Sequence, residues 1–139
     1  MPTDPDCIFC KIVAGQIPAA KVLETASAIA FLDIAPVAPG HLLLVAKDHH
    51  RTLADTPPAL ASALAAELPR LVRAVLAATG STALNIVQNN GREAGQVVDH
   101  IHFHLIPRSS GDSFKFQWPH GKYEGDAMQQ MRDRIARAV

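Results

Sequence analysis

The chain has 139 residues, and its 13 lysine and arginine residues balance its 13 aspartate and glutamate residues. This length suits one domain, residues 1–139, and a formal net charge of zero argues against broad electrostatic contact with nucleic acid or an anionic membrane. Apolar residues make up 48% of the chain, as a packed globular core requires. We therefore expect a globular protein with no nucleic-acid partner and no membrane partner.

Two cysteines, Cys7 and Cys10, lie close together near the amino terminus. A disulfide between them would close almost no loop, and the βαβ pattern expected around a thioredoxin-like redox pair is absent. A metal-binding pair is the interpretation that remains, provided that the fold supplies two more ligands. Residues 1–6 show no basic segment leading into an apolar one, and no apolar run approaches 18 residues, so we predict a cytoplasmic protein.

The first predicted elements are short. Residues 7–14 form a mixed apolar segment of helical character, and residues 21–24 and 28–32 indicate two strands around a turn. Two prolines and a glycine make residues 33–40 a shaped loop. The continuous apolar run over residues 41–46 is typical of a central strand that is covered on both faces.

The clearest helix is predicted over residues 57–79, with Thr56 as its N-cap and Gly80 after its end. Pro69 lies inside this range and predicts a bend or a break in the helix. Apolar side chains recur in the helix at spacings of three and four, which marks one buried face. The residues of this face are Leu60, Leu64, Leu68, Leu71, Val72, Val75 and Leu76.

Two further strands are predicted over residues 83–88 and 100–107, and a terminal helix over residues 126–139. Five short strands, one long helix and shorter terminal helices define an α+β fold with a mainly antiparallel sheet. A sheet with one principal helix leaves a face or an edge to cover, so we expect a homodimer. The apolar side of the terminal helix carries Met128, Met131, Ile135 and Val139.

Three histidines, His100, His102 and His104, alternate with apolar residues in the last predicted strand. A strand would project them to one face, with about 6.6 Å between successive imidazoles. They could bind a catalytic metal with Asp99 or Asp33 as a further ligand, or supply a nucleophile that attacks phosphorus while its neighbours bind phosphate oxygens. A polar strand face that merely meets solvent is a third interpretation. The spacing alone does not choose between the two chemistries.

This strand, preceded by Asn89-Asn90-Gly91 and Ala94-Gly95-Gln96, resembles the histidine triad (HIT) family, whose hallmark is His-φ-His-φ-His-φ-φ with φ apolar. The likeness runs from Cys7 to Arg108 through IFCKI, AFLDI, APGH and NNGREAGQ in that order. It is strongest to the bacterial Hint-like branch of nucleoside phosphoramidases that carry an amino-terminal Cys-x-x-Cys. The resemblance implies a HIT-like fold with its core over residues 7–108 and a C-terminal extension and helix over residues 109–139.

The resemblance also implies roles for individual residues. His102 matches the nucleophile that becomes nucleotidylated, His104 matches the residue that assists at the phosphate and leaving group, and His41 matches a fourth histidine near the phosphate. Asp33 matches the carboxylate that binds both ribose hydroxyls. The positions that match the apolar base slot and the phosphate pocket are Ile8, Phe9, Ile12, Phe31 and Ile34 for the base, and Asn89, Gly95 and Gln96 for the phosphate.

Two positions depart from the family pattern. Val97 stands where other members have a serine that touches the phosphate, so one hydrogen bond is missing from this part of the nucleotide site. Asp99 precedes the triad where an apolar or aromatic residue is common. The first change bears on rate or on leaving-group preference, and the second places a carboxylate beside either a catalytic histidine or a metal ligand.

In the same branch the two cysteines share a metal with two histidines, which match His49 and His100 here. Four ligands with no open position indicate a structural Zn²⁺ rather than a catalytic one. His50 is the neighbouring alternative to His49, and two reduced cysteines without a metal are the alternative to a zinc site. His120 matches no site residue, and we expect it to be exposed. The resemblance implies no organic cofactor.

We therefore predict a hydrolase that acts at the α-phosphate of a purine nucleoside phosphoramidate through a nucleotidyl-histidine intermediate. A dinucleoside polyphosphate hydrolase is the alternative among enzymes, because it uses the same triad with a larger leaving group. A nucleotide-binding interaction module without turnover is the alternative of a different class.

Overall fold

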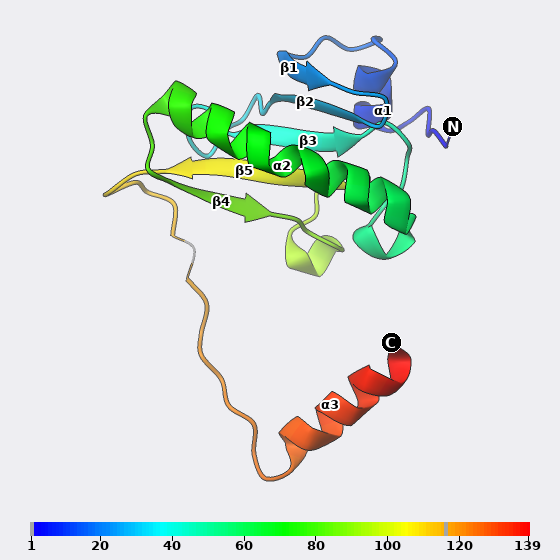
Figure 1. Ribbon diagram of the computed structural model, residues 1–139, viewed down its shortest axis with the longest axis vertical. Helices are drawn as coiled ribbons and strands as arrows, with labels where there is room; N and C mark the ends of the chain where they lie inside the picture. Colours follow the sequence, from blue (N-terminus) through cyan, green and yellow to red (C-terminus); the bar gives the residue numbers. More distant parts are fainter. Residues whose placement is uncertain (1, 116) are drawn as a thin grey trace.

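The computed structural model describes residues 2–115 and 117–139. Five antiparallel strands form one sheet in the order β1-β2-β3-β5-β4 (Figure 1). The strands are β1 (Lys21–Glu24), β2 (Ala28–Leu32), β3 (Leu42–Ala46), β4 (Ala83–Val87) and β5 (His102–Arg108). The helices are α1 (Ile8–Val13), α2 (Pro58–Thr79) and α3 (Ala127–Ala138), with short 3₁₀ turns η1 (Leu53–Asp55) and η2 (Arg92–Ala94).

The central strands are apolar on both faces because each face is covered by a different helix. Alternate residues of β2 and β3, such as Ala30 and Leu44, pack against α2, which lies across one face of the sheet (Figure 1). The intervening residues, such as Phe31 and Val45, pack against α1 on the other face. This arrangement confirms the central strand that was predicted from the apolar run over residues 41–46.

The register of β5 decides which of its side chains share the α1 face. His102 pairs with Val45 and His104 pairs with Leu43, so both imidazoles lie on the α1 side of the sheet. Phe103 between them packs into the α2 core. The alternation predicted for this strand therefore holds from His102 onward, and it places two of the three histidines next to α1.

The strand begins at His102, however, and not at residue 100 as predicted. The His100 N–H donates to the Val98 carbonyl at 2.8 Å, and the Ile101 N–H donates to the His50 carbonyl at 2.7 Å. These bonds hold the two residues to loops instead of to a neighbouring strand. His100 is consequently separated from the other two histidines and belongs to a different cluster.

Helix α2 differs from its prediction in two further details. Pro57 is its N-cap, whereas the Thr56 hydroxyl donates to the Thr52 carbonyl at 2.8 Å. Pro69 does not break the helix, which runs from Pro58 to Thr79. Pro69 lies on the exposed side, as does Ala65, whose carbonyl would have accepted a bond from position 69, so water can replace that bond.

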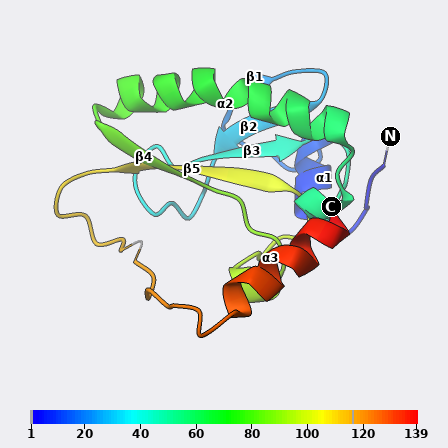
Figure 2. The same ribbon diagram turned by 60° about the horizontal axis from the view of Figure 1, so that its bottom comes forward.

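The C-terminal segment extends away from the sheet before it ends in α3 (Figures 1 and 2). This helix confirms the predicted terminal helix, and none of its residues is buried. Its apolar side chains Met128 and Ile135 remain 56% and 57% exposed. The homodimer stays a prediction. Among the described residues, no helix combines the length and apolar character that a membrane span requires.

Candidate active site and metal centre

Four predicted metal ligands converge where α1 meets the end of β3 and the start of β5. Cys7 is the N-cap of α1 and Cys10 lies within the helix, while His49 follows β3 and His100 precedes β5. Their ligand atoms all lie within 4.8 Å of one another. Cys7 Sγ is 3.4 Å from His100 Nδ1, and Cys10 Sγ is 3.4 Å from His49 Nδ1. Residues distant in sequence thus form one Cys2His2 cluster.

The hydrogen bonds of His100 orient its ring toward the cysteines. His100 Nε2 lies 2.8 Å from the Ala46 carbonyl, and a carbonyl can only accept, so Nε2 carries the proton. The unprotonated Nδ1 then faces the two sulfur atoms. Burial is the main cause that lowers the pKa of His100 to about 4, which keeps its ring neutral at pH 7. A neutral imidazole with a free nitrogen aimed at thiols is the form that binds Zn²⁺.

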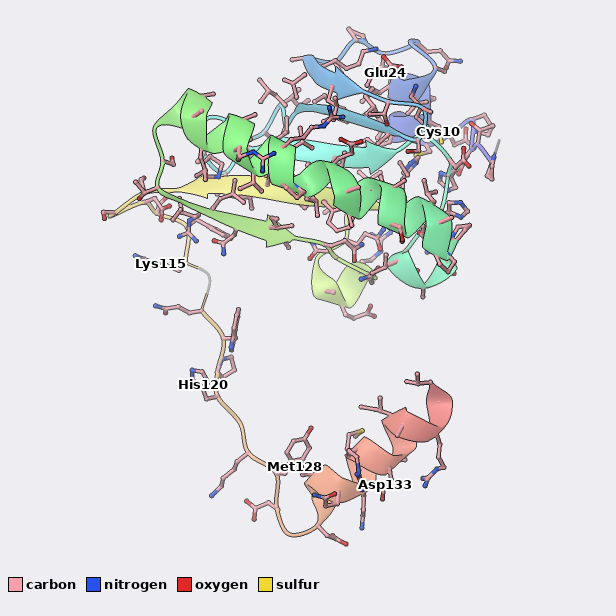
Figure 3. All side chains as sticks on the ribbon, in the orientation of Figure 1. Cys10, Glu24, Lys115, His120, Met128 and Asp133 are labelled. Atoms are coloured by element: carbon pink, nitrogen blue, oxygen red, sulfur yellow. The ribbon has the colours of Figure 1, made fainter. Side chains whose placement is uncertain are left out.

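The neighbouring candidates His50 and Asp99 lie outside this cluster. The backbone carbonyl of His50 accepts the Ile101 N–H, and the Asp99 carboxylate lies 3.4 Å from the Arg51 guanidinium at the surface. Of the two adjacent histidines, His49 is the one that meets the cysteines. His120 lies on the extended C-terminal segment and is exposed, as predicted (Figure 3).

His102 is held in one tautomer by the backbone of the residue two positions earlier. Its Nδ1 lies 2.6 Å from the His100 carbonyl, so Nδ1 must donate and Nε2 carries a free lone pair. The Phe9 ring packs edge-on against the imidazole at a centroid distance of 5.0 Å. Burial lowers the pKa of His102. The result is a neutral, oriented imidazole with one nucleophilic nitrogen.

A second chain of hydrogen bonds fixes His41 and His104. The Val37 N–H donates to His41 Nδ1 at 3.0 Å, which leaves the proton of the neutral His41 ring on Nε2. His41 Nε2 in turn lies 2.9 Å from His104 Nδ1, so His41 donates and His104 keeps its proton on Nε2. The heavy-atom geometry therefore assigns opposite tautomers to His102 and His104. The first offers a lone pair at Nε2, and the second offers an N–H donor at Nε2.

The surroundings of these histidines favour their neutral forms. Burial, followed by the neighbouring His102 and His41, lowers the pKa of His104 to about 4. Burial also lowers the pKa of His41. The Asp33 carboxylate, 3.7 Å from His41 Nε2, acts in the opposite direction but is the weaker of the two effects. Asp33, His41 and His104 have ligand atoms close enough for a metal, but a hydrogen bond accounts for the short contact between the two rings.

A cavity of about 420 Å³ lies in front of His102 and His104. Its wall is mostly apolar, and Asp33 supplies a carboxylate. Most residues predicted to contact a nucleotide line this cavity: Ile8, Phe9, Ile12, Phe31, Asp33, Ile34, Gly95, Val97, His102 and His104. Val97 is 84% exposed, so its side chain is available to a ligand at this wall.

Two predicted phosphate residues are not among the residues that line this cavity. Asn89 donates from Nδ2 to the Gly95 carbonyl at 3.4 Å, and the Gln96 side chain is buried among backbone groups. The cavity also includes residues that sequence reasoning missed, among them Ile17, Ala19 and Leu43. Leu43 was detectable, because period two in a strand that pairs with the histidine strand puts it beside His104. Ile17 and Ala19 lie in an irregular segment that gives no periodic signal.

A sequence profile of the HIT domain matches residues 14–111. The chain is 45% identical over 114 residues to the adenosine 5′-monophosphoramidase hnt1 of Schizosaccharomyces pombe, a match that covers 81% of this chain and 83% of the relative. It is 42% identical over 107 residues to the adenylylsulfatase HINT3 of Arabidopsis thaliana, covering 77% of this chain but 54% of that longer relative. The chain belongs to the HIT family.

Solved structures agree with this assignment. SMU.412c from Streptococcus mutans has a TM-score of 0.93 at 38% identity, covering 98% of this chain and 87% of that chain. A zinc-bound histidine triad family protein from Mycobacterium smegmatis has a TM-score of 0.75 at 34% identity, covering 96% of this chain and 95% of that chain. The HIT-like α+β fold predicted from the sequence is thereby confirmed.

The depressed pKa of His104 predicts how stability depends on pH. An unfolded histidine titrates near 6.5 and the folded His104 near 4, so the unfolded chain binds more protons between these values. The free energy of unfolding therefore falls as the pH drops from 7.5 to 5. We expect about 1 kcal/mol from His104, a figure reduced for its partial access to solvent. Urea denaturation at both pH values measures the change.

His104→Gln should remove this part of the pH dependence, and His120→Gln should leave it unchanged because His120 is exposed. If the wild type and His104→Gln lost the same stability between pH 7.5 and pH 5, the burial of a neutral His104 would not contribute to the pH dependence.

Proposed function

We propose that this protein is a hydrolase that cleaves purine nucleoside phosphoramidates at the α-phosphate, with His102 as the nucleophile. The observation that carries the proposal is the free Nε2 lone pair of His102, fixed at the wall of a cavity that also holds an apolar slot and the Asp33 carboxylate. The relative in Schizosaccharomyces pombe, which is named an adenosine 5′-monophosphoramidase, supports this substrate class.

The nucleotide would lie with its base between α1 and β2 and its phosphate toward β5. Ile8, Ile12 and Phe31 offer apolar contact for a purine, and the two oxygens of Asp33 suit the adjacent hydroxyls of a ribose. The backbone at Gly95 and the Nε2–H of His104 lie on the phosphate side of the cavity. The phosphate is then held by neutral donors, without a general positive field.

In the first step, His102 Nε2 attacks the α-phosphorus and the phosphorus–nitrogen bond breaks. The leaving nitrogen takes one additional proton from solvent and departs as a neutral amine. Nucleotidylation makes the His102 ring cationic, and the His100 carbonyl at 2.6 Å from Nδ1 stabilises that charge. The Nε2–H of His104 donates to a phosphoryl oxygen whose charge grows in the transition state.

In the second step, water attacks the same phosphorus and the His102–phosphorus bond breaks. The products are the nucleoside monophosphate and the neutral His102 ring, and the water proton passes to solvent or phosphate. Protonated imidazole lacks the lone pair that the first step needs, so burial of His102 maintains the reactive form near pH 7.

A dinucleoside polyphosphate or another adenylyl compound would react by the same two steps with a different leaving group. The Arabidopsis relative is named an adenylylsulfatase, which supports cleavage next to an adenylyl group more broadly. Val97 bears on this choice, because its side chain offers no hydrogen bond to a phosphate or leaving group. Comparison of kcat/KM for AMP phosphoramidate and diadenosine polyphosphates decides between them.

Trapping the intermediate tests the nucleophile. We expect rapid acid-free quenching of the wild type during turnover, followed by mass spectrometry of its peptides, to find one nucleotidyl group on the peptide that contains His102. His102→Ala should lose this adduct and about 10⁴-fold in kcat, because the covalent step has no other nucleophile.

The His102→Ala protein should still bind AMP, and His120→Ala should behave as the wild type. Turnover without a trapped adduct would overturn the assignment of His102. AMP binding with no turnover of any adenylyl substrate would instead indicate the nucleotide-binding interaction module.

We further propose that Cys7, Cys10, His49 and His100 hold a structural Zn²⁺. The two thiols and two imidazoles match the ligands that zinc prefers, and the Mycobacterium smegmatis neighbour with bound zinc supports the assignment. Burial raises the pKa of the Cys7 thiol, so a bound cation would be needed to hold this sulfur as a thiolate. When bound, the metal joins α1 to the run of chain that enters β5.

Removal of one thiol tests this metal site. We expect one zinc per wild-type chain by elemental analysis, and loss of that zinc in Cys10→Ala. The same substitution should lower the free energy of unfolding by about 4 kcal/mol or more, because the metal stabilises only the folded chain. Full stability and turnover in a metal-free wild type would contradict a structural zinc.

A further inference from the structure

The amide of Gln96 is buried and fully engaged with the backbone. Its side chain is only 3% exposed, and Nε2 donates to the Arg51 carbonyl at 2.6 Å and to the Val98 carbonyl at 3.0 Å. Its Oε1 accepts the Gly91 N–H at 2.7 Å. Both amide hydrogens are therefore used within the chain, and none remains to contact a phosphate.

The three backbone partners of Gln96 belong to segments that serve different sites. The Arg51 carbonyl lies two residues after His49, and the Val98 carbonyl lies two residues before His100. The amide therefore holds both segments that bring histidines to the Cys2His2 cluster. Its oxygen holds the start of the loop that contains Gly95, which lines the cavity. A single side chain thus joins the metal cluster to the wall on the phosphate side.

Other bonds along the same segments are less central. The Leu53 N–H donates to Asn90 Oδ1 at 2.7 Å, but Asn90 is exposed, so water can replace that contact. The Ile101 N–H donates to the His50 carbonyl, which joins the two histidine segments without reaching the cavity loop. Gln96 is a buried side chain whose hydrogen bonds reach all three segments.

We infer that Gln96 is a positioning residue that couples occupancy of the metal cluster to the shape of the phosphate side of the cavity. An apolar replacement removes the donor to the Arg51 carbonyl and the acceptor of the Gly91 N–H, and it leaves the Val98 carbonyl with the His100 N–H alone. The segments that carry His49 and His100 and the loop that contains Gly95 then lose the side chain that joins them. The base slot between α1 and β2 has no bond to Gln96. The coupling should therefore affect the binding of the phosphate and spare the binding of the nucleoside.

Gln96→Met tests the inference, because methionine has a similar length and no hydrogen-bonding amide. Titration calorimetry measures the affinities for AMP and adenosine, and competition with a chelator measures the affinity for Zn²⁺. We expect AMP and Zn²⁺ each to bind about tenfold more weakly or worse, and adenosine to change less than twofold.

Thr56→Val is the matched control. Its hydroxyl is also buried and donates to a backbone carbonyl at 2.8 Å, but it contacts neither the cluster nor the cavity. This variant should leave all three affinities within twofold of the wild type. Equal weakening of AMP and adenosine in Gln96→Met, or no change in AMP and Zn²⁺, would overturn the inference.

A measurement on the wild type covers the case in which Gln96→Met does not fold. Removal of Zn²⁺ by a chelator should weaken AMP about tenfold and leave adenosine unchanged, and restored Zn²⁺ should reverse the effect. AMP affinity that is independent of Zn²⁺ would refute the coupling. The inference rests on the proposed function, because its ligand is the proposed nucleotide. A wild type that binds no AMP would contradict the proposed function. Normal AMP binding by the metal-free wild type would contradict the coupling alone.

Discussion

The backbone around His100 is the constraint on which the site depends. The imidazole of this residue donates to the Ala46 carbonyl and turns its free nitrogen to the cysteines, while its own carbonyl accepts the Nδ1–H of His102. One residue therefore faces the Cys2His2 cluster with its side chain and orients His102 with its main chain. Because His100 precedes the strand instead of lying in it, both contacts are possible at once.

Burial supplies the second requirement of the proposed mechanism, which is a neutral state for His102 and His104. The same apolar contacts that pack α1 against the sheet remove water from around His102 and His104, and the pKa of each ring falls. Packing of the sheet and the neutral state of these histidines are thus linked in this chain. The proposed phosphate site would use oriented neutral donors, which is compatible with a formal net charge of zero.

Much of this arrangement was predictable from local sequence. The apolar run over residues 41–46 and the alternation after His100 fix the central strands, because each pattern admits one orientation toward two covering layers. The cysteine pair was predictable as a metal-binding pair from its spacing, but its partners His49 and His100 were predictable only through family resemblance, since no spacing rule joins them to the cysteines. The fold then brings their ligand atoms within 4.8 Å of one another.

The errors have a common physical origin. Thr56 does not cap α2, His100 does not enter β5, and the Gln96 amide faces the chain instead of the cavity. In each case a backbone carbonyl accepts the hydrogen bond: Thr52 for the Thr56 hydroxyl, Val98 for the His100 N–H, and Arg51 and Val98 for the Gln96 amide. The Arg51 carbonyl is 45 residues from Gln96 in sequence, so no local pattern reveals this partner. The Thr52 and Val98 carbonyls lie within four residues of their donors, and the conformation of the loop decides whether they are used.

The central claim is that hydrogen bonds to the backbone and between rings fix opposite tautomers in His102 and His104. Long-range ¹H–¹⁵N correlation NMR of the wild type at pH 7 measures the protonation of each ring nitrogen directly. The hydrogen bonds predict a protonated Nδ1 and a bare Nε2 in His102, and a bare Nδ1 and a protonated Nε2 in His104. A protonated Nε2 in His102, or a doubly protonated ring at either position, would contradict this claim.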